Sequence, residues 1–233
     1  MLLKNFTQST REDYYRFVVK FLEFTGKDAM SMTYGDIRKF IFHLQDDEHK
    51  KASTINVYTA AIRFFFEYTL GYVWDSKKIP KMKRDRKLPV ILTKEQVNML
   101  IDSMDNYKHK AITATMYSSG LRVSEVCHLR YEDISRTKKM IHVSLSKNRQ
   151  DRYTILSDHN LDILTEYWFA YERPTGWLFP KQYDASKPID TFFISRHMRA
   201  HEDELGWEHR ITCHSFRHAF GTHLYENGTD LLT

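Results

Sequence analysis

The sequence predicts a mainly α protein with a small antiparallel β-sheet, built from a helical N-terminal domain and an α+β C-terminal domain. Apolar residues recur every three or four positions through most of the 233 residues, which is the period of an amphipathic helix. The period changes to two only within 139–156, where two strand-like runs flank a polar turn. A basic stretch with two prolines, 77–89, separates the two parts. We therefore predict domains at 1–76 and 90–233, joined by a linker over 77–89.

The N-terminal domain is predicted to be a bundle of three or four helices. Its first helix begins at a capping box formed by Ser9 and Glu12 and ends at Gly26. The second begins near Thr33 and the third near Ser53, each with apolar residues on one face. Apolar residues make up 42% of the chain, which is enough to build a core.

The predicted linker carries much of the positive charge of the chain. Residues 1–87 hold 17 Lys and Arg against 11 Asp and Glu, whereas residues 88–233 hold 18 against 19. The linker contains a single acid, Asp85, and the bases Lys77, Lys78, Lys81, Lys83, Arg84, Arg86 and Lys87. Composition leaves a plain solvated linker open as an alternative. A basic connection between two domains nevertheless indicates contact with a polyanion such as DNA.

The C-terminal domain is predicted to begin with helices, to contain one β-hairpin and then to return to helices. Thr93 and Gln96 form a capping box at its start, and Gly120 ends the helix that follows. The runs "KMIHVSL" and "RYTIL" predict two strands around the turn "SKNRQD". Further helices are predicted over 161–172, 190–206 and 214–224.

Composition excludes several classes of protein. No apolar run approaches the roughly 20 residues that a membrane span needs, and the start "MLLKNFTQST" lacks the apolar region of a secretory signal. The two cysteines, Cys127 and Cys213, are too few for a disulfide framework or a thiolate zinc site. We therefore expect a cytoplasmic protein without membrane contact, associated with the nucleoid if it binds DNA.

The segment "HSFRHAFGTHL" places His214, Arg217 and His218 within five positions of a predicted helix. Two histidines one turn apart can bind zinc, but the metalloprotease motif needs a Glu directly after the first His, and Ser215 stands there. Ordinary surface histidines are a second alternative. Arg217 favours a third interpretation, because a His and an Arg one turn apart form a two-donor clamp for a phosphate. We expect no metal at this site.

A second arginine has a similar setting in "SSGLRVSE". Gly120 ends one helix and Arg122 is predicted to lie in the first turn of the next, where free N–H groups and the helix dipole favour an anion. The alternative is an ordinary surface pair between Arg122 and Glu125, three residues apart.

The hairpin turn provides a third group of cations, Lys147, Arg149 and Arg152. Such basic turns are commonly just solvated. In an enzyme that transfers phosphoryl groups, however, a turn lysine can reach into the site and donate a proton to a departing oxygen.

The order and spacing of "SSGLRVSEVCHLRYEDI", a basic β-hairpin and "HSFRHAFGTHLYENG" resemble the tyrosine recombinases, the phage integrase and Xer-like family. The resemblance covers essentially the whole chain, so 1–76 resembles the helical, SAM-like core-binding domain and 90–233 the α+β catalytic domain. It implies a site-specific recombinase that cuts and rejoins DNA strands through a 3′-phosphotyrosine, without a metal or nucleotide cofactor. The implied partners are double-stranded DNA with paired inverted sites and further copies of the protein, as dimers or tetramers on DNA.

The resemblance also implies roles for individual residues. Two arginines would stabilise charge on the phosphate oxygens in the transition state, a histidine would hydrogen-bond the same phosphate, and a hairpin lysine would protonate the leaving 5′-oxygen. By motif position the two arginines are Arg122 and Arg217, the histidine is His214 and the lysine is Lys147. Glu125 and His218 would be supporting residues. The linker bases, Arg149 and Arg152 would bind DNA. The hairpin lysine of the family is commonly flanked by glycines that "LSKNRQDR" lacks, so Lys138 and Lys139 are alternatives to Lys147.

The resemblance implies a nucleophilic tyrosine on the C-terminal side of the second arginine, Arg217, at a position beyond residue 233. Tyr225 stands only eight residues past Arg217 and is expected to pack on its own helix. We therefore expect residues 1–233 to be a fragment that binds DNA without cleaving it, with its nucleophile absent. The alternatives are a type IB topoisomerase, a non-catalytic DNA-binding regulator and a helical protein with an incidental metal site.

Overall fold

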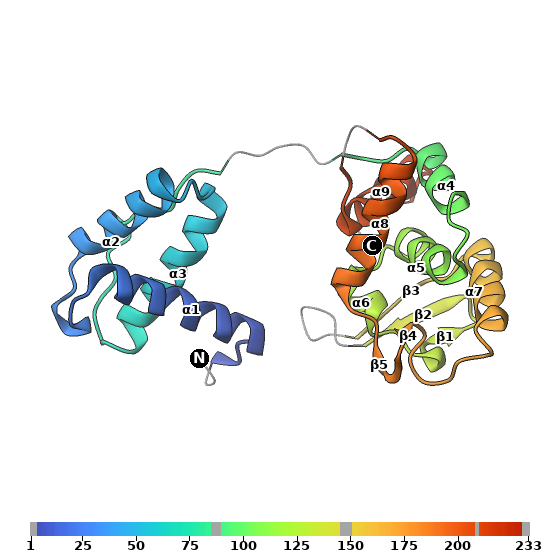
Figure 1. Cartoon of the computed structure of the whole chain (residues 1–233), viewed down its shortest axis with the longest axis horizontal. Helices are drawn as coiled ribbons and strands as arrows, with labels where there is room; N and C mark the ends of the chain where they lie inside the picture. The colour runs from blue at the N-terminus through green and yellow to red at the C-terminus, as the bar shows by residue number, and fades with distance from the viewer. Residues whose placement is uncertain (1–3, 85–89, 145–150, 208–209, 230–233) are drawn as a thin grey trace. The chain divides into compact units, whose positions relative to one another are not determined.

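The computed structural model describes residues 4–84, 90–144, 151–207 and 210–229. The chain divides into two compact units, unit 1 at Met1–Lys87 and unit 2 at Leu88–Thr233 (Figure 1). Both are mainly helical, and unit 2 adds two small antiparallel sheets, so the predicted fold class is confirmed. Within the described part, no helix is long and apolar enough to cross a bilayer.

Unit 1 is a bundle of three helices, α1 (Gln8–Thr25), α2 (Tyr34–Phe42) and α3 (Ala52–Tyr68), with a 3₁₀ turn at Ala29–Ser31 and a π-helical turn at His43–Asp47. Its core is rich in aromatic residues, including the fully buried Phe21 and Phe40. The predicted stop at Gly26 is confirmed, since this residue has a left-handed φ of 59°. The predicted capping box of Ser9 and Glu12 is wrong, because Thr7 caps α1 by accepting a hydrogen bond from the Thr10 N–H.

The first part of the predicted linker is attached to unit 1. Ile79 is buried in the helical bundle, and Met82 packs against the same core. The Asn56 side chain on α3 clamps Met82, donating to its carbonyl at 3.0 Å and accepting from its N–H at 2.9 Å. The apolar residues of 77–84 thus face the bundle, whereas Lys77, Lys78, Lys81, Lys83 and Arg84 are exposed. Arg86 and Lys87 lie outside the described residues.

Replacing Asn56 with alanine is expected to release this basic segment. The substitution leaves the N–H and C=O of Met82 without partners and is expected to cost about 1–3 kcal/mol. Trypsin should then cut within 77–84 faster than in the wild type. Thr59→Ala is the matched control on α3, because the Thr59 hydroxyl bonds the Ile55 carbonyl of its own helix. Equal cleavage rates in the two variants would contradict the clamp.

The described residues of unit 2 form a three-stranded sheet, a two-stranded hairpin and several helices (Figure 1). The helices are α4 (Lys94–Asp102), α5 (Tyr107–Ser118), α6 (Val123–Cys127), α7 (Asp158–Ala170), α8 (Thr191–Glu204) and α9 (Cys213–Glu226). The strands are β1 (Ile134–Ser135), β2 (Met140–Val143), β3 (Arg152–Ile155), β4 (Pro180–Lys181) and β5 (Asp184–Pro188). The predicted hairpin is confirmed as β2 and β3, which pair antiparallel from Met140 with Ile155 to Val143 with Arg152. The capping box of Thr93 and Gln96 is also confirmed.

The β4–β5 hairpin was not predicted from the sequence. Its segment "PKQYDASKP" has a proline at each end and no alternation of apolar and polar residues. The register is also irregular at Pro180 and Lys181. Pairing here depends on surrounding contacts, such as the bond from the Ile189 N–H to the Phe179 carbonyl, rather than on a local pattern.

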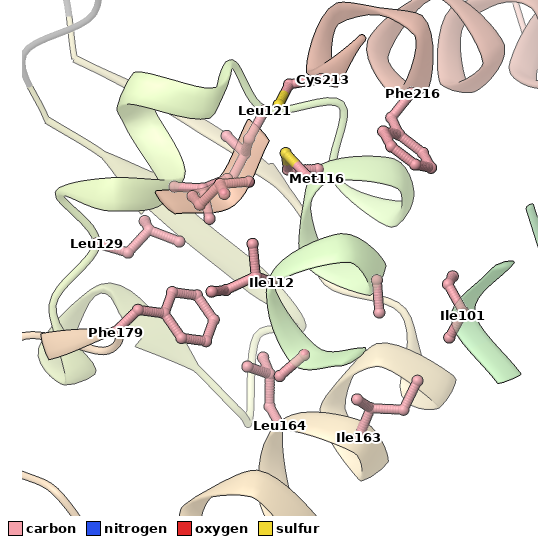
Figure 2. Close-up of a cluster of buried hydrophobic side chains, with 14 of the residues drawn as sticks. Ile101, Ile112, Met116, Leu121, Leu129, Ile163, Leu164, Phe179, Cys213 and Phe216 are labelled. Carbon is pink, nitrogen blue, oxygen red and sulfur yellow. The ribbon is translucent and has the colours of Figure 1, made fainter. Parts of the chain in front are cut away.

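Helix α5 is the central helix of unit 2. Its residues from Ala111 to Met116 are all buried, which is typical of a helix enclosed on every side. It packs against α7 and α9, and Figure 2 shows Ile112 and Met116 within the apolar cluster. Because α5 is held on all sides, the turn at its C-terminal end has a fixed position.

Candidate phosphate-binding site

The candidate site begins at the turn between α5 and α6. Gly120 has a φ of 58°, and a Cβ at this position would lie 2.2 Å from Cδ1 of Phe220 on α9. Only glycine therefore fits, for reasons of both conformation and contact. Leu121 follows and is fully buried, which leaves Arg122 at the edge of the core. Arg122 is the N-cap residue of α6, with extended backbone, one position before the predicted first turn.

The second arginine is brought to the same turn by α9. Phe216 is fully buried and, like Leu121, belongs to the apolar cluster of Figure 2. It therefore fixes the neighbouring Arg217 at the margin of this cluster. Nη1 of Arg217 donates a hydrogen bond of 2.5 Å to the Gly120 carbonyl. Burial and the positive charge of Arg122 lower the pKa of Arg217.

Glu125 lies between two arginines. Its carboxylate accepts bonds from Nη1 of Arg122 at 2.8 Å and from Nη1 and Nη2 of Arg152 at 2.9 and 2.7 Å. It also accepts from the backbone N–H of Arg122 at 2.8 Å, closing a capping box. Burial alone would raise the pKa of Glu125, but the bonds from Arg152 and Arg122 outweigh it and lower the pKa to about 2. The Arg122–Glu125 pair that the spacing left open as an alternative is present, but it is not an ordinary surface pair, because the Glu125 side chain is buried and also bonds Arg152.

Arg152 was predicted as a DNA-binding residue of the hairpin turn. The structure places it at the start of β3, where its guanidinium forms the bidentate pair with Glu125. Bidentate pairing fixes both partners in one geometry. Arg152 thus ties the hairpin to α6, the helix that follows Arg122.

His214 and His218 lie in the first turns of α9, with ring centroids 4.6 Å apart. Desolvation and the charges of His218, Arg217 and Arg122 lower the pKa of His214, so it is neutral at pH 7 and can accept a proton. In the described part of the chain, no group of three His, Cys, Asp or Glu side chains is arranged to hold a metal ion.

The site opens into a pocket of about 300 Å³. Arg152 and Thr154 of β3, Gly120, and Arg217, Phe220 and Leu224 of α9 are among the residues that line it. Arg122, Arg152 and Arg217 form an arginine cluster of three guanidinium groups, in which Arg122 and Arg152 bond Glu125, and Arg152 and Arg217 line the pocket. Such a group of fixed donors can bind a phosphate and stabilise charge that develops on its oxygens.

Lys147 and Arg149, predicted for the hairpin turn, lie outside the described residues. Both alternatives to Lys147 precede β2, and the register places them at the end of the hairpin away from the turn. Lys139 forms an ion pair with Asp158 on α7. Neither Lys138 nor Lys139 is therefore on the side of the hairpin where Arg152 meets Glu125.

Three contacts of the site were missed from the sequence. These are the Arg152–Glu125 pair, the close packing of Phe220 on Gly120, and a bond of 2.9 Å between the Tyr117 hydroxyl and Nδ1 of His223. Each joins residues far apart in the chain. Only Gly120 carried a local signal, because the sequence predicts that this glycine ends the preceding helix.

Comparisons with known proteins identify the family of this fold. The Phage integrase family model matches residues 91–233, and the Phage integrase, N-terminal SAM-like domain matches residues 1–76. The chain belongs to the phage integrase family, whose members are tyrosine recombinases.

Relatives of known sequence support this assignment. The chain is 35% identical over 234 residues to y4qK of Sinorhizobium fredii, which is named as an integrase/recombinase; the match covers 100% of this chain and 75% of y4qK. It is 26% identical over 240 residues to a tyrosine recombinase of Thermosipho africanus, covering 98% of this chain and 83% of that protein.

Solved structures show the same fold. XerH recombinase bound to palindromic difH DNA matches with a TM-score of 0.77 and 18% identity, over 94% of this chain and 69% of XerH. A lambda integrase tetramer bound to a Holliday junction matches with a TM-score of 0.75 and 14% identity, over 97% of this chain and 70% of the integrase.

Proposed function

We propose that this protein acts in site-specific DNA recombination and that its arginine cluster binds the phosphate at which a strand is cut and rejoined. The observation that carries the proposal is the convergence of Arg122 and Arg217 on the Gly120 turn, with Arg152 holding Glu125 beside them. Arg152 and Arg217 bring positive charge to the wall of the pocket beside the turn. A phosphodiester carries a negative charge, and its oxygens accept the hydrogen bonds that guanidinium groups donate.

The proposed chemistry assigns each group one task. Arg122 and Arg217 stabilise negative charge on the non-bridging oxygens as the phosphorus becomes five-coordinate. His214, neutral at pH 7, hydrogen-bonds the same phosphate and can take a proton from the attacking hydroxyl. Lys147 donates a proton to the departing 5′-oxygen. Attack by a tyrosine forms one P–O bond as another breaks, so the energy of the phosphodiester is kept in the covalent link.

We further propose that the strand-cleaving tyrosine is not among residues 1–233. Tyr225 has a side chain that is two-thirds exposed and stands two turns beyond Arg217 on α9, about 12 Å along the helix axis. The Tyr117 hydroxyl is bonded to His223. Among the described tyrosines, none has a recorded hydrogen bond to Arg122, Arg217 or His214. A polypeptide of these residues is therefore proposed to bind DNA without forming a covalent adduct.

The proposed partners are double-stranded DNA with paired inverted sites and further copies of the protein, as dimers or tetramers on DNA. The XerH complex on a palindromic site and the lambda integrase tetramer on a Holliday junction support this, as relatives of the same fold. The exposed bases of 77–84, together with Arg86, Lys87 and Arg149, are proposed to bind the DNA backbone. Binding of this kind would place the protein in the cytoplasm, on the nucleoid.

A trapping assay tests the proposal directly. Residues 1–233 are incubated with fragmented genomic DNA of the source organism and analysed twice, by native gel and by detergent precipitation, which recovers only covalently bound DNA. We expect retarded DNA in the native gel and no DNA in the precipitate. Covalent DNA attached to Tyr225 or another tyrosine of these residues would contradict the missing nucleophile. Absence of retarded DNA would contradict DNA binding itself.

A further inference from the structure

A second cavity of unit 2 lies at the N-terminal end of α5. Its volume is about 630 Å³, within the range of small-molecule sites. The aromatic or cyclic side chains of Tyr167, Tyr171, Pro174, Pro180 and Phe193 are part of its wall. Helix α5 runs from this cavity to the Gly120 turn, and its 12 residues span about 18 Å. The cavity is therefore separate from the arginine cluster.

The feature of interest in this cavity is a buried lysine. Lys108 lines the cavity and is only 6% exposed. Its ammonium group donates to the Pro180 carbonyl and lies 6.0 Å from the centre of the Tyr171 ring. An ammonium has three N–H donors, and in the described residues the carbonyl is its one recorded acceptor. No ion pair of Lys108 with a carboxylate is recorded in the described residues.

Three further observations show that the charge of Lys108 is uncompensated. Lys108 is the second residue of α5, where the helix dipole disfavours a cation. Burial lowers the pKa of Lys108, which reflects the cost of holding this charge away from water. The neighbouring His109 and His197 also have lowered pKa values, His109 to about 4, chiefly because of burial, so they are neutral at pH 7.

The other charged residues of the wall do not neutralise Lys108. Lys181 adds a cation, paired with Asp190 at 3.7 Å. Glu172 lines the cavity but is exposed to solvent, and no ion pair joins it to Lys108. Lys108 is therefore a buried cation beside a cavity whose wall includes aromatic and proline side chains, and no carboxylate of the described residues is paired with it.

We propose that this cavity binds a small organic anion, a carboxylate or phosphate carried on a flat ring, with Lys108 as the residue that binds its charge. The ring would lie among Tyr171, Phe193 and the two prolines, and the acid group would replace water around the ammonium. The cavity lies at the other end of α5 from the arginines. Anion binding in this cavity therefore does not depend on the proposed DNA chemistry.

Calorimetric titration with three probes tests the proposal: benzoate, phenyl phosphate and the neutral benzamide. We expect saturable binding of at least one of the two anions to the wild-type protein, with a Kd on the order of 1 mM or tighter, and no binding of benzamide. Tighter binding of phenyl phosphate would assign a phosphate ligand, and tighter binding of benzoate a carboxylate. Absence of binding by either anion would overturn the proposal.

Three variants locate the binding. Lys108→Met keeps the length and volume of the side chain without its charge and should weaken anion binding at least about tenfold. Lys187→Met on β5 removes an exposed charge outside the cavity wall and should leave binding unchanged. Arg217→Ala should also leave it unchanged. Binding that persists in Lys108→Met and disappears in Arg217→Ala would place the anion at the arginine cluster and overturn the proposal.

The stability of Lys108→Met gives an independent readout that needs no ligand. Because the variant removes an uncompensated buried charge, its Tm without ligand should equal or exceed that of the wild type. A Tm well below the wild-type value would show that the protein itself satisfies this ammonium, and would also overturn the proposal.

Discussion

Replacement of Gly120 with alanine is expected to destabilise unit 2 by about 2–4 kcal/mol. The left-handed φ of 58° costs about 1 kcal/mol or more for a residue with a Cβ. The new methyl group would also lie 2.2 Å from Cδ1 and 3.0 Å from Cγ of Phe220, near the root of a ring that cannot swing away freely. Relieving this clash by moving α9 is expected to cost a further 1–3 kcal/mol. Urea unfolding of the variant measures the sum.

Gly176 provides the matched control for this prediction. It has a φ of 88°, but a Cβ there would meet no atom within 4 Å. Gly176→Ala should therefore show the conformational cost alone, about 1 kcal/mol. A second substitution, Phe220→Leu, should recover part of the stability lost in Gly120→Ala, because it removes the ring. If Gly120→Ala costs no more than Gly176→Ala, the close packing of α9 on the turn is not what fixes Gly120.

Replacement of Glu125 with glutamine is expected to cost about 3 kcal/mol of unfolding free energy. The substitution removes a carboxylate that is 3% exposed and leaves Arg122 and Arg152 with no opposite charge between them. Chemical denaturation measures the loss. Glu67→Gln is the control: it removes a carboxylate from the i,i+4 pair with Arg63, whose side chain is 51% exposed, and should cost no more than about 0.5 kcal/mol. Equal losses in the two variants would contradict the role of Glu125.

The contribution of Glu125 should depend on pH in a defined window. Its pKa is lowered from 4.5 to about 2 in the folded protein, so the folded state holds the carboxylate ionised where the unfolded chain would protonate it. The stabilisation is therefore fully present above pH 4.5 and is lost as the pH falls toward 2. The stability difference between wild type and Glu125→Gln should shrink across this window. A difference that stays constant from pH 6 to pH 3 would contradict the lowered pKa.

The elements of the fold could be predicted because their signals are local. Apolar spacing identified the helices of both units, and the change to a period of two identified β2 and β3. The helix stop at Gly26 was predicted from its residue type, but the Ser9–Glu12 capping box was wrong, because Thr7 two residues earlier is the N-cap and suits that position equally well. The β4–β5 hairpin has no alternating pattern and could not be found in this way.

The composition of the candidate site could be predicted more fully than its geometry. Arg122, Arg217 and His214 stand in short motifs, so their types and spacing indicated a phosphate site. The contacts that fix them join α5, α9 and β3 across the domain, as between Arg152 and Glu125, and no local pattern reports such pairs. The bonds between Asn56 and Met82 in unit 1 also join residues far apart in the chain. The composition of 77–84 predicts a free linker, but these bonds attach the segment to α3.

The salt dependence of DNA affinity tests the central claim, that the arginine cluster of unit 2 binds a DNA phosphate. Fluorescence anisotropy with a labelled duplex measures Kd over a series of salt concentrations for the wild type, Arg217→Ala and Arg136→Ala. Arg136 is the control, because it bonds Thr165 on α7 and does not line the pocket at the Gly120 turn. Thermal unfolding confirms that each variant is folded.

We expect a steep decrease of affinity with salt in the wild type and in Arg136→Ala. In Arg217→Ala the slope of log K against log salt should become shallower by about one, because one phosphate contact is lost. Affinity should fall roughly tenfold at low salt in that variant. If folded Arg217→Ala binds DNA with the affinity and salt slope of the wild type, the arginine cluster does not bind DNA phosphate and the central claim is wrong.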